Sequence, residues 1–68
     1  MANYLLLKEL IADRGLKQRF IANGIGVSDK RMHELLNGGR WKLDEVVAFC
    51  KLLGLTKKQR DDIFFTTV

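Results

Sequence analysis

The chain has 68 residues, of which 47% are hydrophobic and 29% are charged, so it suits one small domain with a compact core. A single cysteine and a single histidine exclude a disulfide framework and a structural zinc site built from this chain alone. No apolar run approaches the roughly 18 residues of a membrane span, so we expect a reduced, cytoplasmic protein with no metal and no cofactor.

The net charge is +4, and its distribution matters more than its size. Residues 14–42 hold seven cations against two acids, whereas the rest of the chain holds five cations against six acids. A localised positive patch on a small domain favours a polyanionic partner. The alternative is an ordinary solvated surface, because a net charge of this size is not extreme.

The apolar spacing is helical from the start of the chain. It predicts a first helix from Tyr4 to Arg14, with Asn3 as its N-cap. A second, short helix is predicted from Lys17 to Asn23. We expect Gly24 and Gly26 to end it, because glycine punctuates helices and allows the chain to turn.

Three more helices follow in the same manner. Ser28 is the predicted N-cap of a helix from Asp29 to Leu36, which Asn37-Gly38-Gly39 ends. Apolar stripes predict a fourth helix from Leu43 to Leu53 and a fifth from Lys57 to about Phe64. Residues 65–68 favour an extended or frayed end. The sequence thus predicts a single all-α domain over residues 1–68, a compact orthogonal bundle of five helices.

The segment from about 17 to 36 has the layout of a helix-turn-helix. The steep crossing of its two helices needs a small side chain, which Ala22 supplies. The turn needs a residue that tolerates a positive φ, which Gly26 supplies. Met32 and Leu35 would hold the second helix, the recognition helix at about 29–36, against the first.

The spacing of several short motifs resembles the phage-repressor and Cro (XRE-like) family of helix-turn-helix proteins. The resemblance covers about residues 6 to 64, and the length is most similar to a stand-alone Cro-type protein. It implies a lambda-repressor-like DNA-binding domain. The motifs that carry it are Gly15-Leu16-Lys17-Gln18, Ile21-Ala22, Gly26-Val27-Ser28, Met32, Leu35-Leu36-Asn37-Gly38, Leu43-Asp44-Glu45-Val46-Val47 and Leu53-Gly54-Leu55-Thr56.

A step of 100° per residue puts the apolar side chains of the recognition helix on one side and a polar row on the other. Lys30 can donate to guanine O6 and N7, and Asp29 or Glu34 can accept from cytosine N4. The resemblance adds Ser28 as a contact to bases or nearby phosphates. His33 is interpreted as a groove-edge or solvated residue, not a metal ligand. The predicted base-reading residues are Ser28, Asp29, Lys30, His33 and Glu34; the alternative is an ordinary solvated face.

Contacts to the DNA backbone are predicted from the resemblance and from charge. The resemblance implies that the amide of Gln18 donates to a phosphate and that Asn37 contacts the backbone, though Asn37 can also cap its helix. It also implies that Arg40, in the following loop, can reach a phosphate or a base edge. For Arg31 two alternatives stay open: it contacts a phosphate, or it forms an ion pair with Glu34. The predicted backbone-contacting residues are Lys17, Gln18, Arg19, Arg31, Asn37, Arg40 and Lys42.

Aromatic and aliphatic side chains in the C-terminal half exceed what five short helices hide easily. They predict either a generous core or a two-fold dimer interface. Trp41 is expected to pack under its loop instead of flanking DNA, and Cys50 to lie in the core. The predicted interface residues are Phe49, Leu52, Phe64 and Phe65.

These observations predict a DNA-binding transcriptional regulator that occupies an operator as a homodimer, a Cro-like repressor of a phage or mobile element. The alternative is a protein-interaction module of the same fold, such as an antirepressor or antitoxin partner. An enzyme is not expected, because no carboxylate pair, activated nucleophile or phosphate loop appears. No small-molecule substrate and no membrane are predicted as partners.

Overall fold

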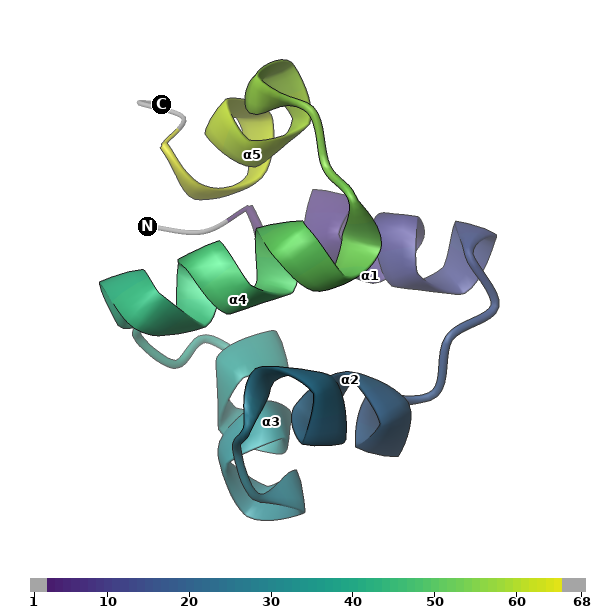
Figure 1. Cartoon of the computed structure of the whole chain (residues 1–68), viewed down its shortest axis with the longest axis vertical. Coiled ribbons are helices and arrows are strands. Elements are labelled where there is room, and N and C mark those ends of the chain that lie inside the picture. The colour runs from purple at the N-terminus through teal and green to yellow at the C-terminus, as the bar shows by residue number, and fades with distance from the viewer. Residues whose placement is uncertain (1–2, 66–68) are drawn as a thin grey trace.

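The computed structural model describes residues 3–65, and over that range it contains five α-helices and no strand (Figure 1). The predicted all-α architecture is confirmed. Of the tail predicted at residues 65–68, residues 66–68 lie outside the described residues. Within the described part of the chain, no helix is long and apolar enough to cross a membrane. The helices are α1 (Tyr4–Asp13), α2 (Gln18–Ile25), α3 (Asp29–Leu36), α4 (Leu43–Leu53) and α5 (Lys57–Phe64).

The ends of the helices follow from capping residues that the sequence displays. The Asn3 side chain accepts a hydrogen bond from the backbone N–H of Leu6 at 3.1 Å, which satisfies one donor of the first turn. Gly54, with a φ of 62°, ends α4 in the left-handed conformation. These local signals explain why the predicted start of α1 and the predicted end of α4 agree with the structure.

The predicted end of α2 was wrong. Gly24 does not stop the helix, which continues to Ile25 and ends at Gly26 with a φ of 79°. Gly24 stays helical because it lies where α2 packs against α4, and that packing outweighs the conformational cost of a helical glycine, about 1 kcal/mol. The turn therefore contains one glycine where the sequence suggested two.

The core lies where α4 passes between the other helices. In the view of Figure 1, α2 and α3 lie below α4 and α5 lies above it. α2 packs against both α3 and α4, and α1 packs against α3 and α5. The largest of the fully buried side chains come from all five helices: Leu7, Ile21, Met32, Leu35, Phe49 and Ile63.

An aromatic cluster closes the core beside the loop between α3 and α4. The Trp41 ring meets Phe49 and Phe64 edge-on, with centroids 5.3 Å and 4.8 Å apart. Phe49 has no exposed surface and Phe64 only 7%. The prediction that these two phenylalanines belong to a dimer interface was therefore wrong, because both side chains are buried in the core. Trp41 packs under its loop as predicted.

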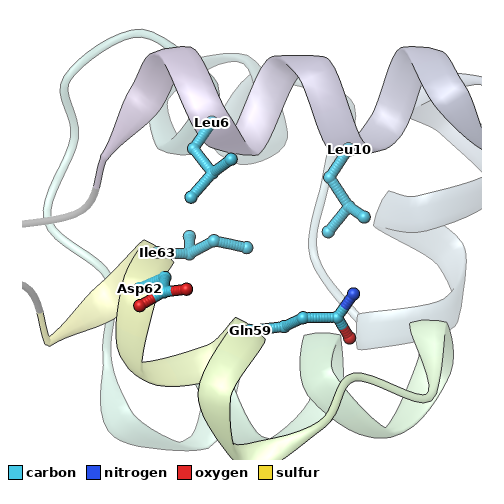
Figure 2. Close-up of a pocket in the computed structure, with 5 residues that line it drawn as sticks. All are labelled: Leu6, Leu10, Gln59, Asp62 and Ile63. Carbon is cyan, nitrogen blue, oxygen red and sulfur yellow. The ribbon is translucent and has the colours of Figure 1, made fainter.

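A small surface pocket marks the contact between α1 and α5. It has a volume of about 100 Å³ and is lined by Leu6, Leu10, Gln59, Asp62 and Ile63. Figure 2 shows both leucines pointing from α1 toward α5, Leu6 toward Ile63 and Leu10 toward the Gln59 side chain. No residue of α2 or α3 lines this pocket, so it is separate from the helix-turn-helix described below.

Candidate nucleic-acid interface

The turn between α2 and α3 has the geometry of a helix-turn-helix. Gly26 adopts the left-handed conformation, and the backbone N–H of Val27 donates to the Ala22 carbonyl at 2.9 Å. The Ser28 side chain accepts from the backbone N–H of Arg31 at 3.1 Å and so begins α3 as predicted. α2 and α3 run in clearly different directions in Figure 1, which leaves the N-terminal end of α3 free to approach a groove.

The recognition helix α3 divides its side chains between core and solvent. Met32, Leu35 and Leu36 are buried against the bundle. The structure exposes all five side chains predicted to read bases, and these are Ser28, Asp29, Lys30, His33 and Glu34. Their role in base contact stays a prediction.

Two residues of α2 reach the start of α3. The Arg19 guanidinium lies 3.4 Å from the Asp29 carboxylate, and the Gln18 amide donates to the Asp29 carbonyl at 3.4 Å. The ion pair is solvent-exposed and contributes little to stability. Its consequence is electrostatic, because the cation offsets an acid that would otherwise repel a phosphate backbone.

Arg31 binds a partner that the sequence analysis did not consider. Its Nε and Nη2 donate to the two carboxylate oxygens of Glu45, at 3.0 Å and 2.9 Å. Nη2 also donates to the Arg40 carbonyl at 2.6 Å, while Glu34 lies 3.6 Å from Nη1. Glu34 is thus a secondary partner, and the guanidinium faces α4 and the loop. The expectation that Arg31 contacts the DNA backbone is not supported by this geometry.

The electrostatics of this pair follow from its hydrogen bonds. The hydrogen bonds from Arg31 hold the pKa of the Glu45 carboxyl below its usual value, although burial acts in the opposite direction. Reciprocally, Glu45 raises the pKa of the Arg31 guanidinium. Both groups are therefore charged over the whole physiological range.

The start of α4 is capped from within the helix. Lys42 occupies the N-cap position, where a lysine side chain has no acceptor to offer. Glu45 compensates by accepting from the backbone N–H of Lys42 at 2.8 Å. The Lys42 side chain is consequently left exposed. The sequence does show an acid, Glu45, in the first turn of this helix, where a carboxylate can accept from the free N–H groups.

The loop between α3 and α4 is anchored at several points. The Tyr4 hydroxyl donates to the Gly39 carbonyl at 2.7 Å, and the Trp41 indole N–H donates to the Leu35 carbonyl at 3.0 Å. The Gly39 N–H donates to the Glu34 carbonyl at 2.7 Å. A Cβ at position 39 would lie 2.6 Å from that same oxygen, so the close approach requires glycine. The anchored loop leaves Arg40 exposed.

Lys8 of α1 lies at the opposite end of the recognition helix and was missed by the sequence analysis. Its Nζ donates to the Asn37 Oδ1 at 3.3 Å, and the Asn37 amide donates to the His33 carbonyl at 2.8 Å. Asn37 therefore caps α3, as one of its two predicted roles required. No local sequence signal identifies Lys8, because it lies 29 residues from its partner.

Exposed cations thus border α3 at both ends. Lys8 lies at its C-terminal end and Arg19 at its N-terminal end, with Lys30 on the helix itself. Of the predicted backbone-contacting residues, Gln18 is half-buried and Arg31 is committed to Glu45. The others are exposed: Lys17, Arg19, Asn37, Arg40 and Lys42.

The apolar surface differs from the one predicted for dimerisation. Besides the buried Phe49 and Phe64, Leu52 is half-buried, whereas Phe65 is 54% exposed with the Arg60 guanidinium 5.6 Å from its ring centroid. The large apolar side chains that α4 exposes are Leu43 and Val47, one turn apart.

Comparison with known protein families identifies the region that contains the helix-turn-helix. Residues 6–59 match the family described as the Cro/C1-type HTH DNA-binding domain, and this range includes α2, the turn and α3. No curated protein and no solved structure is similar enough to the chain to match it. Among residues 3–65, no three His, Cys, Asp or Glu side chains gather as a group that could hold a metal ion.

Proposed function

Because the chain belongs to the Cro/C1-type HTH DNA-binding domain family, we propose that it is a transcriptional regulator that binds specific sequences of double-stranded DNA. α3 enters the major groove with its N-terminal end foremost. One observation carries this proposal: a row of exposed polar side chains follows Ser28, on a helix whose other side is fixed in the core by Met32, Leu35 and Leu36.

The exposed residues divide into two roles. The base edges are faced by the exposed row Ser28, Asp29, Lys30, His33 and Glu34. In this row, side-chain donors would select guanine and side-chain acceptors would select cytosine. Phosphates are held by residues that surround the row and fix the register of the protein on the duplex. This second set is Lys17, Gln18, Arg19, Asn37, Arg40 and Lys42. We include Lys8 as well, because its ammonium group lies beside Asn37.

We further propose that the protein acts as a homodimer in the bacterial or infected-host cytoplasm and represses by occupying an operator, as a Cro-like protein of a phage or mobile element. Two copies would place their recognition helices in successive major grooves, about 34 Å apart. The exposed apolar side chains Leu43, Val47 and Phe65 are the candidate contacts between copies. Sedimentation with and without DNA tests this part, and Val47→Glu should abolish dimers while preserving binding to a single half-site.

DNA binding itself is tested by selecting sequences from a random duplex pool and titrating the selected DNA at several salt concentrations. If about six to ten phosphates are neutralised per dimer, affinity should fall by about 10³–10⁵ between roughly 50 and 200 mM salt. A salt-independent response, or no selection of any sequence, would contradict the proposal.

Single variants then separate the two roles. Lys30→Ala should cost about 1–3 kcal/mol and relax the preference at one base position, whereas Gln18→Ala should weaken all sequences equally. Lys57→Ala is the matched control, because it removes an exposed cation from α5, which lies across α4 from α2 and α3 (Figure 1). It should leave binding nearly unchanged.

A protein-interaction module is the second candidate function, and the acids on the exposed face of α3 favour it. Asp29 and Glu34 would meet a basic protein partner more readily than a phosphate backbone. Against this, each acid already lies near a cation, Arg19 at 3.4 Å and Arg31 at 3.6 Å. The selection experiment decides, because an interaction module enriches no DNA sequence.

A further inference from the structure

One guanidinium joins three segments of the chain beside the proposed DNA surface. Arg31 extends from the first turn of α3, Arg40 belongs to the loop, and Glu45 lies in the first turn of α4. The two side chains form a bidentate pair, and the same guanidinium donates to the loop carbonyl. Glu45 also accepts from the Lys42 backbone N–H. These hydrogen bonds join α3 to α4, α3 to the loop, and the end of the loop to the first turn of α4.

The pair is inward-facing, unlike the cations around it. The Arg31 side chain is 27% exposed and the Glu45 side chain 8%, whereas Arg40 and Lys42 are exposed. Bidentate pairs between guanidinium and carboxylate are the strong, geometrically specific kind. Turning Arg31 outward to a phosphate would break both hydrogen bonds and leave a carboxylate buried without its cation, which is costly.

We propose that Arg31 is a positioning residue, which does not contact DNA but sets where the loop and its cations Arg40 and Lys42 stand relative to the recognition helix. This inference rests on the proposed function, because it concerns how the same DNA surface is built. Tyr4 and Trp41 already fix the loop through the Gly39 and Leu35 carbonyls, and the Arg31 hydrogen bond adds a restraint at Arg40 itself. Without the pair, Arg40 and Lys42 would lose binding energy in becoming ordered on DNA.

Two conservative variants distinguish positioning from direct contact. Arg31→Lys keeps the positive charge but cannot form the bidentate pair. If Arg31 contacts a phosphate, this variant should bind nearly as the wild type does; if it positions the loop, affinity should fall about tenfold. Glu45→Gln is sharper, because it removes an anion near the DNA. Charge alone predicts tighter binding, whereas positioning predicts the same loss of about tenfold.

Coupling between the two positions provides the next readout. The double variant Arg31→Lys/Glu45→Gln should bind no more weakly than either single variant, because one broken link cannot be broken twice. Additive losses would overturn the proposal. Circular dichroism and melting temperature are measured alongside, so that every affinity refers to folded protein.

A loss of stability alone would lower the active fraction without changing how steeply the affinity depends on salt. The proposal predicts a shallower salt dependence as well. Because Arg40 and Lys42 are proposed to hold phosphates, Glu45→Gln should reduce the salt slope by about one per protomer, although it removes an anion. A salt slope equal to that of the wild type overturns the positioning role.

Failure of this inference is separable from failure of the proposed function. If the wild type binds no DNA, the proposed function fails, and amide exchange in the free protein tests the positioning role by itself. The Gly39 N–H, which donates to Glu34, should then exchange several-fold faster in Glu45→Gln. An unchanged rate would mean that the loop is held without Arg31, and the inference would fall.

Discussion

The backbone of Gly24 lies directly against the side chain of Leu52. A Cβ at position 24 would stand 2.6 Å from the Leu52 Cδ2 and 2.9 Å from its Cδ1. The absence of a Cβ at position 24 thus makes room for Leu52 where α2 packs against α4. Any larger residue forces Leu52 or α2 to move.

Gly24→Ala is therefore expected to gain less than the roughly 1 kcal/mol of helix propensity that alanine offers, because the end of the Leu52 side chain must move to make room. Denaturant unfolding measures the difference. In a Leu52→Ala background, the full gain should appear, because the clash is gone. A full gain of about 1 kcal/mol for Gly24→Ala in the wild type would contradict this contact.

The position of Lys8 predicts a phosphate contact from outside the helix-turn-helix. Lys8→Ala should weaken binding to every DNA sequence alike and reduce the salt slope by about one per protomer. Its hydrogen bond to Asn37 is exposed, so the melting temperature should hardly change. Lys57→Ala serves again as the control. A sequence-dependent loss would assign Lys8 to base recognition instead.

Ser28 combines a structural role with a proposed contact, and two substitutions separate them. Ser28→Ala removes the acceptor for the Arg31 N–H and should cost about 1 kcal/mol of stability. Ser28→Asp keeps an acceptor at that position and should stay stable, but it adds an anion where DNA is expected. Its affinity for DNA should fall at least tenfold.

Thr56 provides the matched control for Ser28. Its side chain caps α5 by accepting from the Gln59 N–H at 3.1 Å. Thr56→Ala should therefore cost a similar free energy of unfolding but leave the affinity of the folded protein for DNA intact. Equal effects of Ser28→Asp and Thr56→Ala on DNA binding would argue against a DNA contact near Ser28.

The lowered pKa of Glu45 predicts an acid-sensitive contribution to stability. Because Arg31 lowers the folded-state pKa of this carboxyl, the unfolded state binds the proton more readily. The contribution is fully present above the unfolded pKa and is lost as pH falls through the folded one. Free energies of unfolding compared from about pH 7 down to about pH 3 should converge between the wild type and Glu45→Gln at the acid end. A difference that persists or widens in acid would contradict this assignment.

Local chemistry allowed most of the fold to be predicted. Helix starts are indicated by side chains that can cap them, those of Asn3 and Ser28, and a helix end is indicated by Gly54, which tolerates a positive φ. The structure has helix ends at all three positions. Gly24 was misinterpreted because its reason is a neighbour on another helix. A glycine required by packing and a glycine that ends a helix look alike in a sequence.

The candidate site was predictable only in part. Lys30 and its exposed neighbours follow from helical periodicity alone, because the buried side of α3 is strongly apolar. The Arg31–Glu45 pair does not, since it depends on how α3 meets α4 across 14 residues of sequence. Likewise, the burial of Phe49 and Phe64 depends on Trp41 inserting beside them. Such contacts arise from the assembled bundle, not from any one segment.

The placement of Trp41 gives the protein an intrinsic fluorescent reporter. It is the chain's single tryptophan, and its indole N–H is bound to the last turn of α3 while its ring touches two core phenylalanines. Its emission should be blue-shifted in the folded state and should move toward the red on solvent exposure. Unfolding, and any disturbance of the junction between α3 and the following loop, can therefore be followed optically on the unlabelled molecule.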